Sequence, residues 1–150
     1  MFLHKMFCTV LGIGYTGKGG GSVAALVCCL GWMLIWDNGP HALVQVLGTL
    51  VLIAAGVWSS EKLEAAWGKD SSRIVVDEVA GMCVSLLWIP VRVEYVLISF
   101  LLFRFFDIVK PLFIRRIEKL PAGWGVMFDD LLAGVYANVV LQIFIVIFRK

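Results

Sequence analysis

Apolar residues fill five long stretches of the chain, and short polar or proline-containing segments separate them. The stretches are Gly21–Trp36, His41–Trp58, Ile74–Ile89, Glu94–Val109 and Val126–Phe148. A helix that crosses a membrane needs about 20 mostly apolar residues, with a range of about 17–25, and these stretches approach that length. The chain shows no strand-like alternation and no internal repeat. The pattern therefore predicts an all-α, polytopic membrane helix bundle with about four or five spanning helices.

Polar and proline positions predict where these helices end. A tight break at Asp37–Pro40 follows the first stretch, and Pro90 and Pro111 stop the third and fourth because proline cannot continue a helix. The second stretch continues into a polar helical segment, Ser59–Lys69. Two shorter helices are also expected, one N-terminal at or dipping into the membrane and one interfacial: Phe2–Ile13 and Leu112–Leu120.

Composition supports the membrane assignment. The 150 residues are 61% hydrophobic and 16% charged, and the mean hydropathy is +0.92. Soluble domains average about 45–50% apolar and about 25% charged residues, so most soluble enzymes, secreted disulfide scaffolds and disordered chains are excluded. We expect one integral-membrane domain over residues 1–150, without a cleaved targeting segment. The net charge of +2 is too small to indicate nucleic acid, and no protein partner is inferred.

The four cysteines form no C-x-x-C pair, and the two that are adjacent cannot easily bridge each other. They are Cys8, Cys28, Cys29 and Cys83. Three of them sit within apolar runs and the first lies near one. We interpret them as reduced, buried residues rather than as metal ligands or a disulfide framework.

Basic residues predict the orientation of the bundle. With five spans, one side of the membrane receives ten of them: Lys5, Lys18, Lys62, Lys69, Arg73, Arg104, Lys110, Arg115, Arg116 and Lys119. The other side receives three, Arg92, Arg149 and Lys150. Because cytoplasmic loops carry an excess of Lys and Arg, the first side is predicted to face the cytoplasm.

Five carboxylates border three of the predicted spans, all near the cytoplasmic ends: Asp77, Glu78, Asp107, Asp129 and Asp130. An ionisable residue in a membrane helix is costly and is a functional candidate by default. Crowded carboxylates need protons or bound cations, and oxygen ligands without Cys or His suit Mg²⁺, Mn²⁺ or Ca²⁺.

Two basic residues lie close to the third of these acids along one predicted helix. Arg104, Asp107 and Lys110 recur at i, i+3 and i+6, so they occupy neighbouring positions on one helical surface. Acids, a divalent cation and basic side chains together suit a phosphate ester, because positive charge stabilises the phosphoryl oxygens. The sequence thus favours a metal-assisted phosphate site at the cytoplasmic face.

Plainer interpretations stay open. The acids at helix N-termini could simply favour the helix dipole, and Asp107 could serve only as an ion-pair partner of Arg104 or Lys110. Acids on several helices also fit a cation or proton transporter. That function would more often place polar groups at the membrane midplane, whereas these acids cluster at one face and none of them sits mid-span.

The glycine-rich segment Gly12–Ser22 matches G-x-G-x-x-G but lacks the strand and α/β unit that a nucleotide site needs. Two interpretations remain: its backbone N–H groups receive a phosphate at the following helix, or it is a plain connecting loop. The only histidines are His4 and His41, and neither C-x₅-R nor G-x-S-x-G occurs. Metal-activated water with a carboxylate base, or an Asp nucleophile, remains possible, and the sequence does not choose between them.

Three separated motifs resemble the phosphatidylglycerophosphatase A family. They are Asp77–Met82 (D-E-x-x-G-M), Phe103–Pro111 (F-R-x-x-D-x-x-K-P) and Gly125–Gly134 (G-x-x-x-D-D-x-x-A-G), and the likeness runs from about Gly12 to Tyr136. The resemblance implies a bacterial inner-membrane, Mg²⁺-dependent enzyme of phospholipid biosynthesis. Its reaction removes the terminal phosphate of phosphatidylglycerophosphate and yields phosphatidylglycerol.

The resemblance also implies roles for individual residues. The expected catalytic residues are Asp107, Asp77 and Asp130, and the expected Mg²⁺ ligands are Asp77, Glu78, Asp129 and Asp130. The expected phosphate-binding residues are Arg104, Lys110, Lys18 and Ser22. The family usually has a P-G-T-x-G-S loop, of which only Gly21–Ser22 matches here. Lys18 then supplies a phosphate-binding charge or the loop has another role, and another lipid phosphate is the alternative substrate.

Overall fold

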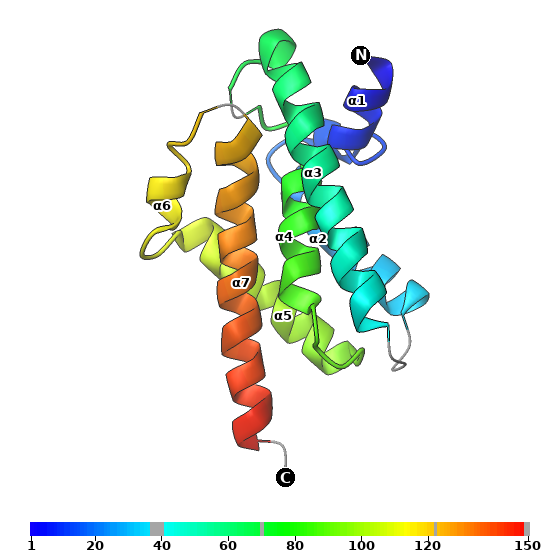
Figure 1. Cartoon of the computed structure of the whole chain (residues 1–150), viewed down its shortest axis with the longest axis vertical. Coiled ribbons are helices and arrows are strands. Elements are labelled where there is room, and N and C mark those ends of the chain that lie inside the picture. The colour runs from blue at the N-terminus through cyan, green and yellow to red at the C-terminus, as the bar shows by residue number, and fades with distance from the viewer. Residues whose placement is uncertain (37–40, 70, 122, 149–150) are drawn as a thin grey trace.

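The computed structural model describes residues 1–36, 41–69, 71–121 and 123–148, and this part of the chain contains helices and no strands (Figure 1). The all-α prediction is confirmed for these ranges. The elements in chain order are α1 Phe2–Cys8, the 3₁₀ turn η1 Ile13–Thr16, α2 Gly20–Ile35, α3 Ala42–Trp67, α4 Val76–Leu86, α5 Val93–Val109, α6 Ile114–Ile117 and α7 Gly123–Phe148.

Each of the five predicted long helices is present, and α3 includes most of the polar stretch that begins at Ser59. The largest difference is in α4, which ends at Leu86 although an apolar helix was expected to reach Ile89. The helix stops because Leu87 is extended and Trp88 takes a left-handed φ of 60°. The predicted break at 37–40 lies outside the described residues.

Two of the described helices, α3 and α7, are long and apolar enough to cross a membrane. Each has 26 residues, whereas α2, α4 and α5 have 16, 11 and 17. The expected count of four or five spanning helices is therefore not confirmed. The two apolar helices indicate that the protein associates with a membrane.

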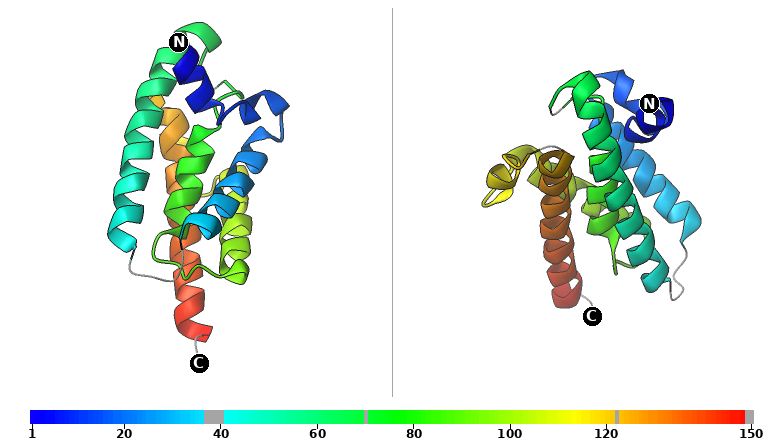
Figure 2. Two further views of the ribbon diagram at one scale, coloured as in Figure 1. Left: turned by 90° about the vertical axis from the view of Figure 1, so that its right-hand side faces the viewer. Right: turned by 45° about the horizontal axis from the view of Figure 1, so that its top comes forward.

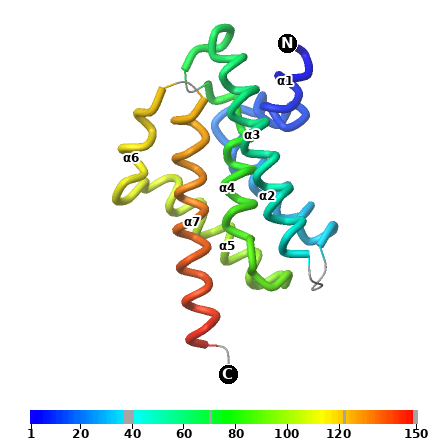
Figure 3. Tube along the Cα trace, viewed as in Figure 1, coloured from blue at the N-terminus to red at the C-terminus, as the bar shows by residue number. Residues whose placement is uncertain are grey.

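The long helices alternate in direction, as the two further views in Figure 2 show. The N-terminus, the end of α3 and the beginnings of α4 and α7 lie in the upper half of Figure 1, and the C-terminus lies at the bottom. Helix α4 is central, because it packs against α2, α3, α5 and α7 (Figure 3). Side chains on α4 can therefore meet residues from most of the bundle.

Helices α4 and α7 approach each other closely where both carry glycine. A Cβ atom added at Gly134 would clash with the carbonyl oxygen of Gly81, and one added at Gly81 would lie 2.6 Å from the carbonyl oxygen of Asp130. Small residues let helix backbones come this near. The approach sets the second turn of α7 beside the first turns of α4.

Polar side chains from the middle of α7 and α5 bind the end of α4. The Asn138 amide nitrogen on α7 lies 3.2, 3.0 and 2.7 Å from the carbonyl oxygens of Val84, Ser85 and Leu87. The Ser99 hydroxyl on α5 donates to the Ser85 carbonyl oxygen at 3.1 Å. These bonds satisfy carbonyls at the end of α4 that would otherwise be costly to leave unpaired in an apolar environment.

The two short helices predicted from the sequence are also present. The N-terminal one, α1, ends at Cys8 rather than Ile13, and it packs on α3, where His4 Nδ1 lies 3.0 Å from Ser59 Oγ. The interfacial one, α6, occupies the middle of the predicted stub. The four cysteines are free thiols, as expected, and three of them are buried.

The glycine contact between α4 and α7 makes a testable prediction. Gly134→Ala should lower the free energy of unfolding by about 1–3 kcal/mol, because the Gly81 carbonyl is backbone and cannot move aside. Gly48→Ala on α3 is the matched control, since nothing lies within 4 Å of its added Cβ. Denaturant titration in mild detergent measures both. Equal stability of the two variants would contradict the close contact.

Candidate active site

The first turn of α4 carries the acid pair Asp77 and Glu78. The chain enters this turn along a fixed path, because the Val75 N–H donates to the Cys8 carbonyl oxygen at 2.9 Å. Carboxylates at a helix N-terminus are favoured by the helix dipole. The Asp77 side chain points inward and is only 7% exposed, so it is more than an interfacial cap.

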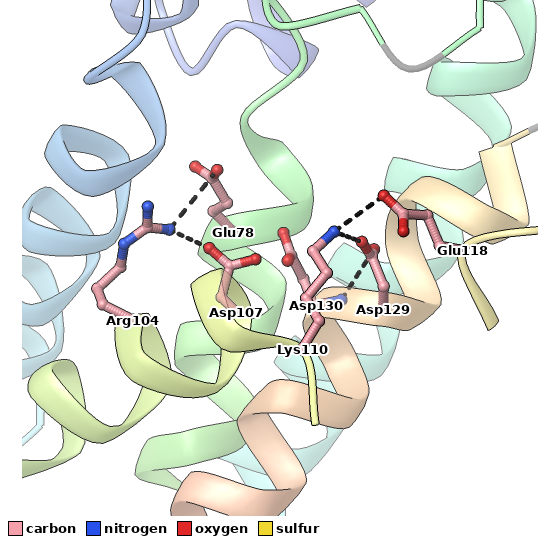
Figure 4. A network of polar contacts seen from close by, with 7 residues as sticks. All are labelled: Glu78, Arg104, Asp107, Lys110, Glu118, Asp129 and Asp130. Carbon is pink, nitrogen blue, oxygen red and sulfur yellow. Dashed lines mark hydrogen bonds and ion pairs between the residues drawn. The ribbon is translucent and has the colours of Figure 1, made fainter. Parts of the chain in front are cut away.

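The last turns of α5 add Arg104 and Asp107, which form an ion pair one turn apart (Figure 4). Arg104 Nη1 also lies 3.8 Å from Glu78 Oε1 on α4. The guanidinium thus bridges acids from two helices. The sequence left open an ion pair of Asp107 with Arg104, and the structure shows this pair.

Lys110 follows α5 directly in a left-handed conformation with φ 48° and ψ 59°. Its ammonium lies 2.8 Å from Asp129 Oδ2 and 3.1 Å from Glu118 Oε1 (Figure 4). Partial burial alone would lower the pKa of Lys110, but the two carboxylates outweigh it, so its pKa is raised above the usual value. Lys110 therefore stays protonated throughout the neutral range.

Helix α7 contributes Asp129 and Asp130 from its second turn, 7% and 4% exposed. The Asp130 N–H donates to Asp129 Oδ1 at 3.0 Å. The close contact of Gly81 with the Asp130 backbone holds this turn against α4. Two buried acids of α7 are thereby fixed beside the acid pair of α4.

All five predicted acids line one cavity of about 190 Å³, together with Lys110. Its other lining residues are Ser71, Ser72, Ile74, Glu118 and Val126. Three helices that are separate in the sequence therefore bring their carboxylates to a single place. Such a set of negative charges is held together only if cations or protons compensate the repulsion.

Three predicted site residues do not line this cavity: Arg104, Lys18 and Ser22. Arg104 nevertheless contacts two acids that do, Glu78 and Asp107. Lys18 is exposed in the segment before α2, and Ser22 is half-buried in its first turn; neither lines the cavity. The structure adds Glu118, Ser71 and Ser72, which were not predicted. Glu118 lies in a segment whose other charged residues are basic. It is eight residues from Lys110, outside any single helix that contains both, so helical spacing could not predict their contact.

The donor atoms of the cavity fit a hard divalent cation. Asp77 Oδ1 and Glu78 Oε2 are buried and have no hydrogen-bond partner, and carboxylate oxygens are the ligands that Mg²⁺ prefers. Over residues 1–36, 41–69, 71–121 and 123–148, no three acidic, thiol or imidazole side chains form a ready-made ligand set. The donors thus fit by chemistry and burial, and gathering three around one ion would need side chains to move.

Arg104 offers the opposite chemistry next to the cavity, where its guanidinium contacts the lining acids Glu78 and Asp107. Its Nε is also buried and has no hydrogen-bond partner among the described residues. An N–H of a guanidinium suits a phosphate oxygen. Unpaired acceptors for a cation in the cavity therefore lie near a cationic side chain that suits an anion.

Comparison with known proteins agrees with this chemistry. The family model described as phosphatidylglycerophosphatase A matches residues 6–145. A protein of Bacteroides thetaiotaomicron named "Putative phosphatidylinositol-3-phosphatase" is 40% identical over 148 residues, which cover 95% of this chain and 93% of that protein. No solved structure matches the chain.

Two relatives named phosphatidylglycerophosphatase A are also similar. The Haemophilus influenzae protein is 42% identical over 101 residues, which cover 65% of this chain and 62% of that protein. The Escherichia coli protein is 33% identical over 129 residues, which cover 81% of this chain and 69% of that protein. The chain thus spans slightly under two thirds of the first of these relatives and slightly over two thirds of the second.

The charge compensation at the cavity can be tested through Lys110. Lys110→Met should lower the free energy of unfolding by about 1–3 kcal/mol in metal-free buffer, because buried Asp129 loses its charged donor. Arg92→Met is the control: its pair with Glu94 is largely exposed and worth at most about 1 kcal/mol. Chemical unfolding in detergent compares the two. A Lys110→Met protein as stable as the Arg92→Met protein would rule out this compensation.

Proposed function

The chain belongs to the phosphatidylglycerophosphatase A family, and we propose that it hydrolyses the terminal phosphate monoester of a membrane lipid, with phosphatidylglycerophosphate as the leading substrate. The observation that carries this proposal is the cavity in which six carboxylates meet Lys110, with Arg104 in contact with two of them. A cavity of about 190 Å³ suits a phosphate group, while two acyl chains must remain outside it.

Its position supports a lipid substrate. The cavity is built from the beginnings of α4 and α7 and from the end of α5. A lipid phosphate lies at the headgroup level, so ends of membrane helices can reach it while the acyl chains stay in the bilayer. The five-span topology predicted from the sequence assigns ten of the thirteen basic residues to this side, which supports a cytoplasmic site in a multi-pass inner-membrane protein.

We assign Mg²⁺ binding to the buried acids of α4 and α7. The proposed ligands are Asp77, Glu78, Asp129 and Asp130, and the unpartnered oxygens of the α4 pair support this choice. When bound, Mg²⁺ supplies positive charge that stabilises the phosphoryl oxygens. Lys110 pairs with Asp129 here, and its ammonium would be able to turn toward the phosphate if Asp129 served as a metal ligand instead.

The cationic side chains would bind and orient the phosphate. Arg104 offers its Nε, which has no hydrogen-bond partner among the described residues, and Lys110 offers its protonated ammonium group at the cavity wall. Asp107, held by Arg104, would either take the proton of a water that attacks phosphorus, or attack phosphorus itself to form an acyl phosphate that water then hydrolyses to release phosphate. The bond between phosphorus and the glycerol oxygen breaks, and that oxygen takes up a proton. Phosphate binding by Lys18 and Ser22 stays a prediction.

A phosphorylated inositol lipid is the second candidate substrate. The relative that matches 95% of the chain at 40% identity is named for phosphatidylinositol 3-phosphate. The segment Gly17–Ser22 also departs from the loop that the family usually carries. Both substrates present a phosphate monoester on a lipid headgroup, so the same acids and cations would serve either of them.

Phosphate release from defined lipids tests the function. The purified protein in mild detergent should release phosphate from phosphatidylglycerophosphate with Mg²⁺ and should stop in excess EDTA. Phosphatidylinositol 3-phosphate assayed in parallel decides between the two substrates. Release from neither lipid by folded protein would contradict the proposal, whereas release that persists in EDTA would contradict only the metal dependence.

The assigned acids make a further prediction. Asp107→Asn and Asp130→Asn should each lower the rate of phosphate release by at least about 100-fold, because each removes a charge that the reaction needs. Glu94→Gln is the control, since Glu94 is exposed and its ion pair among the described residues is with exposed Arg92. Rates per folded molecule are compared after size-exclusion chromatography. If both Asn variants keep the wild-type rate, the site assignment is wrong.

A further inference from the structure

The glycines of segment 12–22 have different structural reasons to be glycine. Gly12 and Gly17 have positive φ angles of 101° and 89°, which side chains disfavour. Gly14 and Gly21 are in contacts so close that a Cβ atom would not fit. Gly19 has neither property, because its φ is −95° and nothing lies within 4 Å of an added Cβ. The segment is therefore a folded structure and not a uniformly flexible loop.

Part of this segment fixes the chain just before α4. A Cβ atom at Gly14 would clash with the backbone carbonyl of Arg73. Two residues later, the Val75 N–H is bonded to the Cys8 carbonyl oxygen. The chain that leads into the acid pair is thus held from the N-terminal side.

The end of the segment reaches the acid pair itself. A Cβ atom at Gly21, in the first turn of α2, would take the space that the Glu78 carboxylate occupies. The same carboxylate faces Arg104, 3.8 Å away on α5. Glu78 is therefore confined between the backbone of α2 and the guanidinium that binds Asp107 (Figure 4).

We propose that Gly21 is a positioning residue, whose missing side chain lets the backbone of α2 hold the Glu78 carboxylate against Arg104 at the cavity. This inference rests on the proposed phosphatase function. It assigns to the glycine-rich segment the placement of an acid, whereas the other interpretation has the segment bind the phosphate directly. The two differ in which kinetic constant changes when the segment is altered.

Alanine at the two close-contact glycines should have different effects. At Gly14 the added methyl group meets backbone, which cannot move aside, so folding should suffer. At Gly21 it meets the far end of a flexible side chain, so Glu78 can swing away and the fold can persist. Gly21→Ala should therefore preserve thermal stability while it displaces Glu78 from Arg104.

The experiment compares Gly21→Ala with Gly19→Ala in steady-state phosphate release and in thermal unfolding. Gly21→Ala should lower kcat by about 100-fold with KM unchanged, because misplacing a catalytic group by about 1 Å has an effect of that size. Its melting temperature should match that of the wild type. Gly19→Ala should keep both kinetic constants, since its methyl group meets nothing.

Three results would overturn the inference: wild-type kcat in Gly21→Ala, a raised KM in both glycine variants, or lost activity in both. If Gly21→Ala melts early, it is repeated in a Glu78→Ala background, where the methyl group should no longer matter. An equal fall in melting temperature in both backgrounds also overturns the inference. A wild-type protein that releases no phosphate is a failure of the proposed function instead.

Discussion

The close contact of α4 and α7 at Gly81 and Gly134 determines the rest of the structure. Neither glycine has room for a side chain, because each faces a backbone carbonyl of the other helix. In a membrane, such small residues give helices contact that the hydrophobic effect cannot supply. Their consequence here is chemical: the first turn of α4 and the second turn of α7 lie at one level, and four of the five acids lie in these two turns. Wider spacing would separate the acids.

Gathering acids in this way is electrostatically unfavourable, and the protein compensates only part of it. Lys110 pairs with Asp129, and Arg104 pairs with Asp107 and faces Glu78. Asp77 Oδ1 and Glu78 Oε2 remain buried without partners. Unpaired buried polar atoms cost free energy unless something binds them. A functional site is expected to sacrifice some folding stability in this way. Here the unpaired groups are of the kinds that suit a cation and a phosphate.

The sequence predicts most of the helices, because the apolar stretches and Pro111 act locally, whereas α4 ends before Pro90 can stop it. It also predicts that the acids converge, because alternating helices place them at one end. Three features depend on contacts between distant segments and could not be predicted. The Asn138 amide donates to the Leu87 carbonyl oxygen just after α4, and Glu118 forms an ion pair with Lys110. The backbone at Gly21 packs against the Glu78 carboxylate. The residue pattern also does not fix the number of spans: of the helices in the described residues, α3 and α7 are the two that are long and apolar enough to cross a membrane.

The most direct test of the central claim is the position of a bound divalent ion. A structure determined with Mn²⁺ in place of Mg²⁺ would locate it by anomalous scattering. We expect an anomalous peak in the cavity between α4 and α7, in contact with the carboxylates of Asp77, Glu78 or Asp130. A peak bound elsewhere, or none in the cavity at saturating Mn²⁺, would contradict the assignment of these acids as ligands.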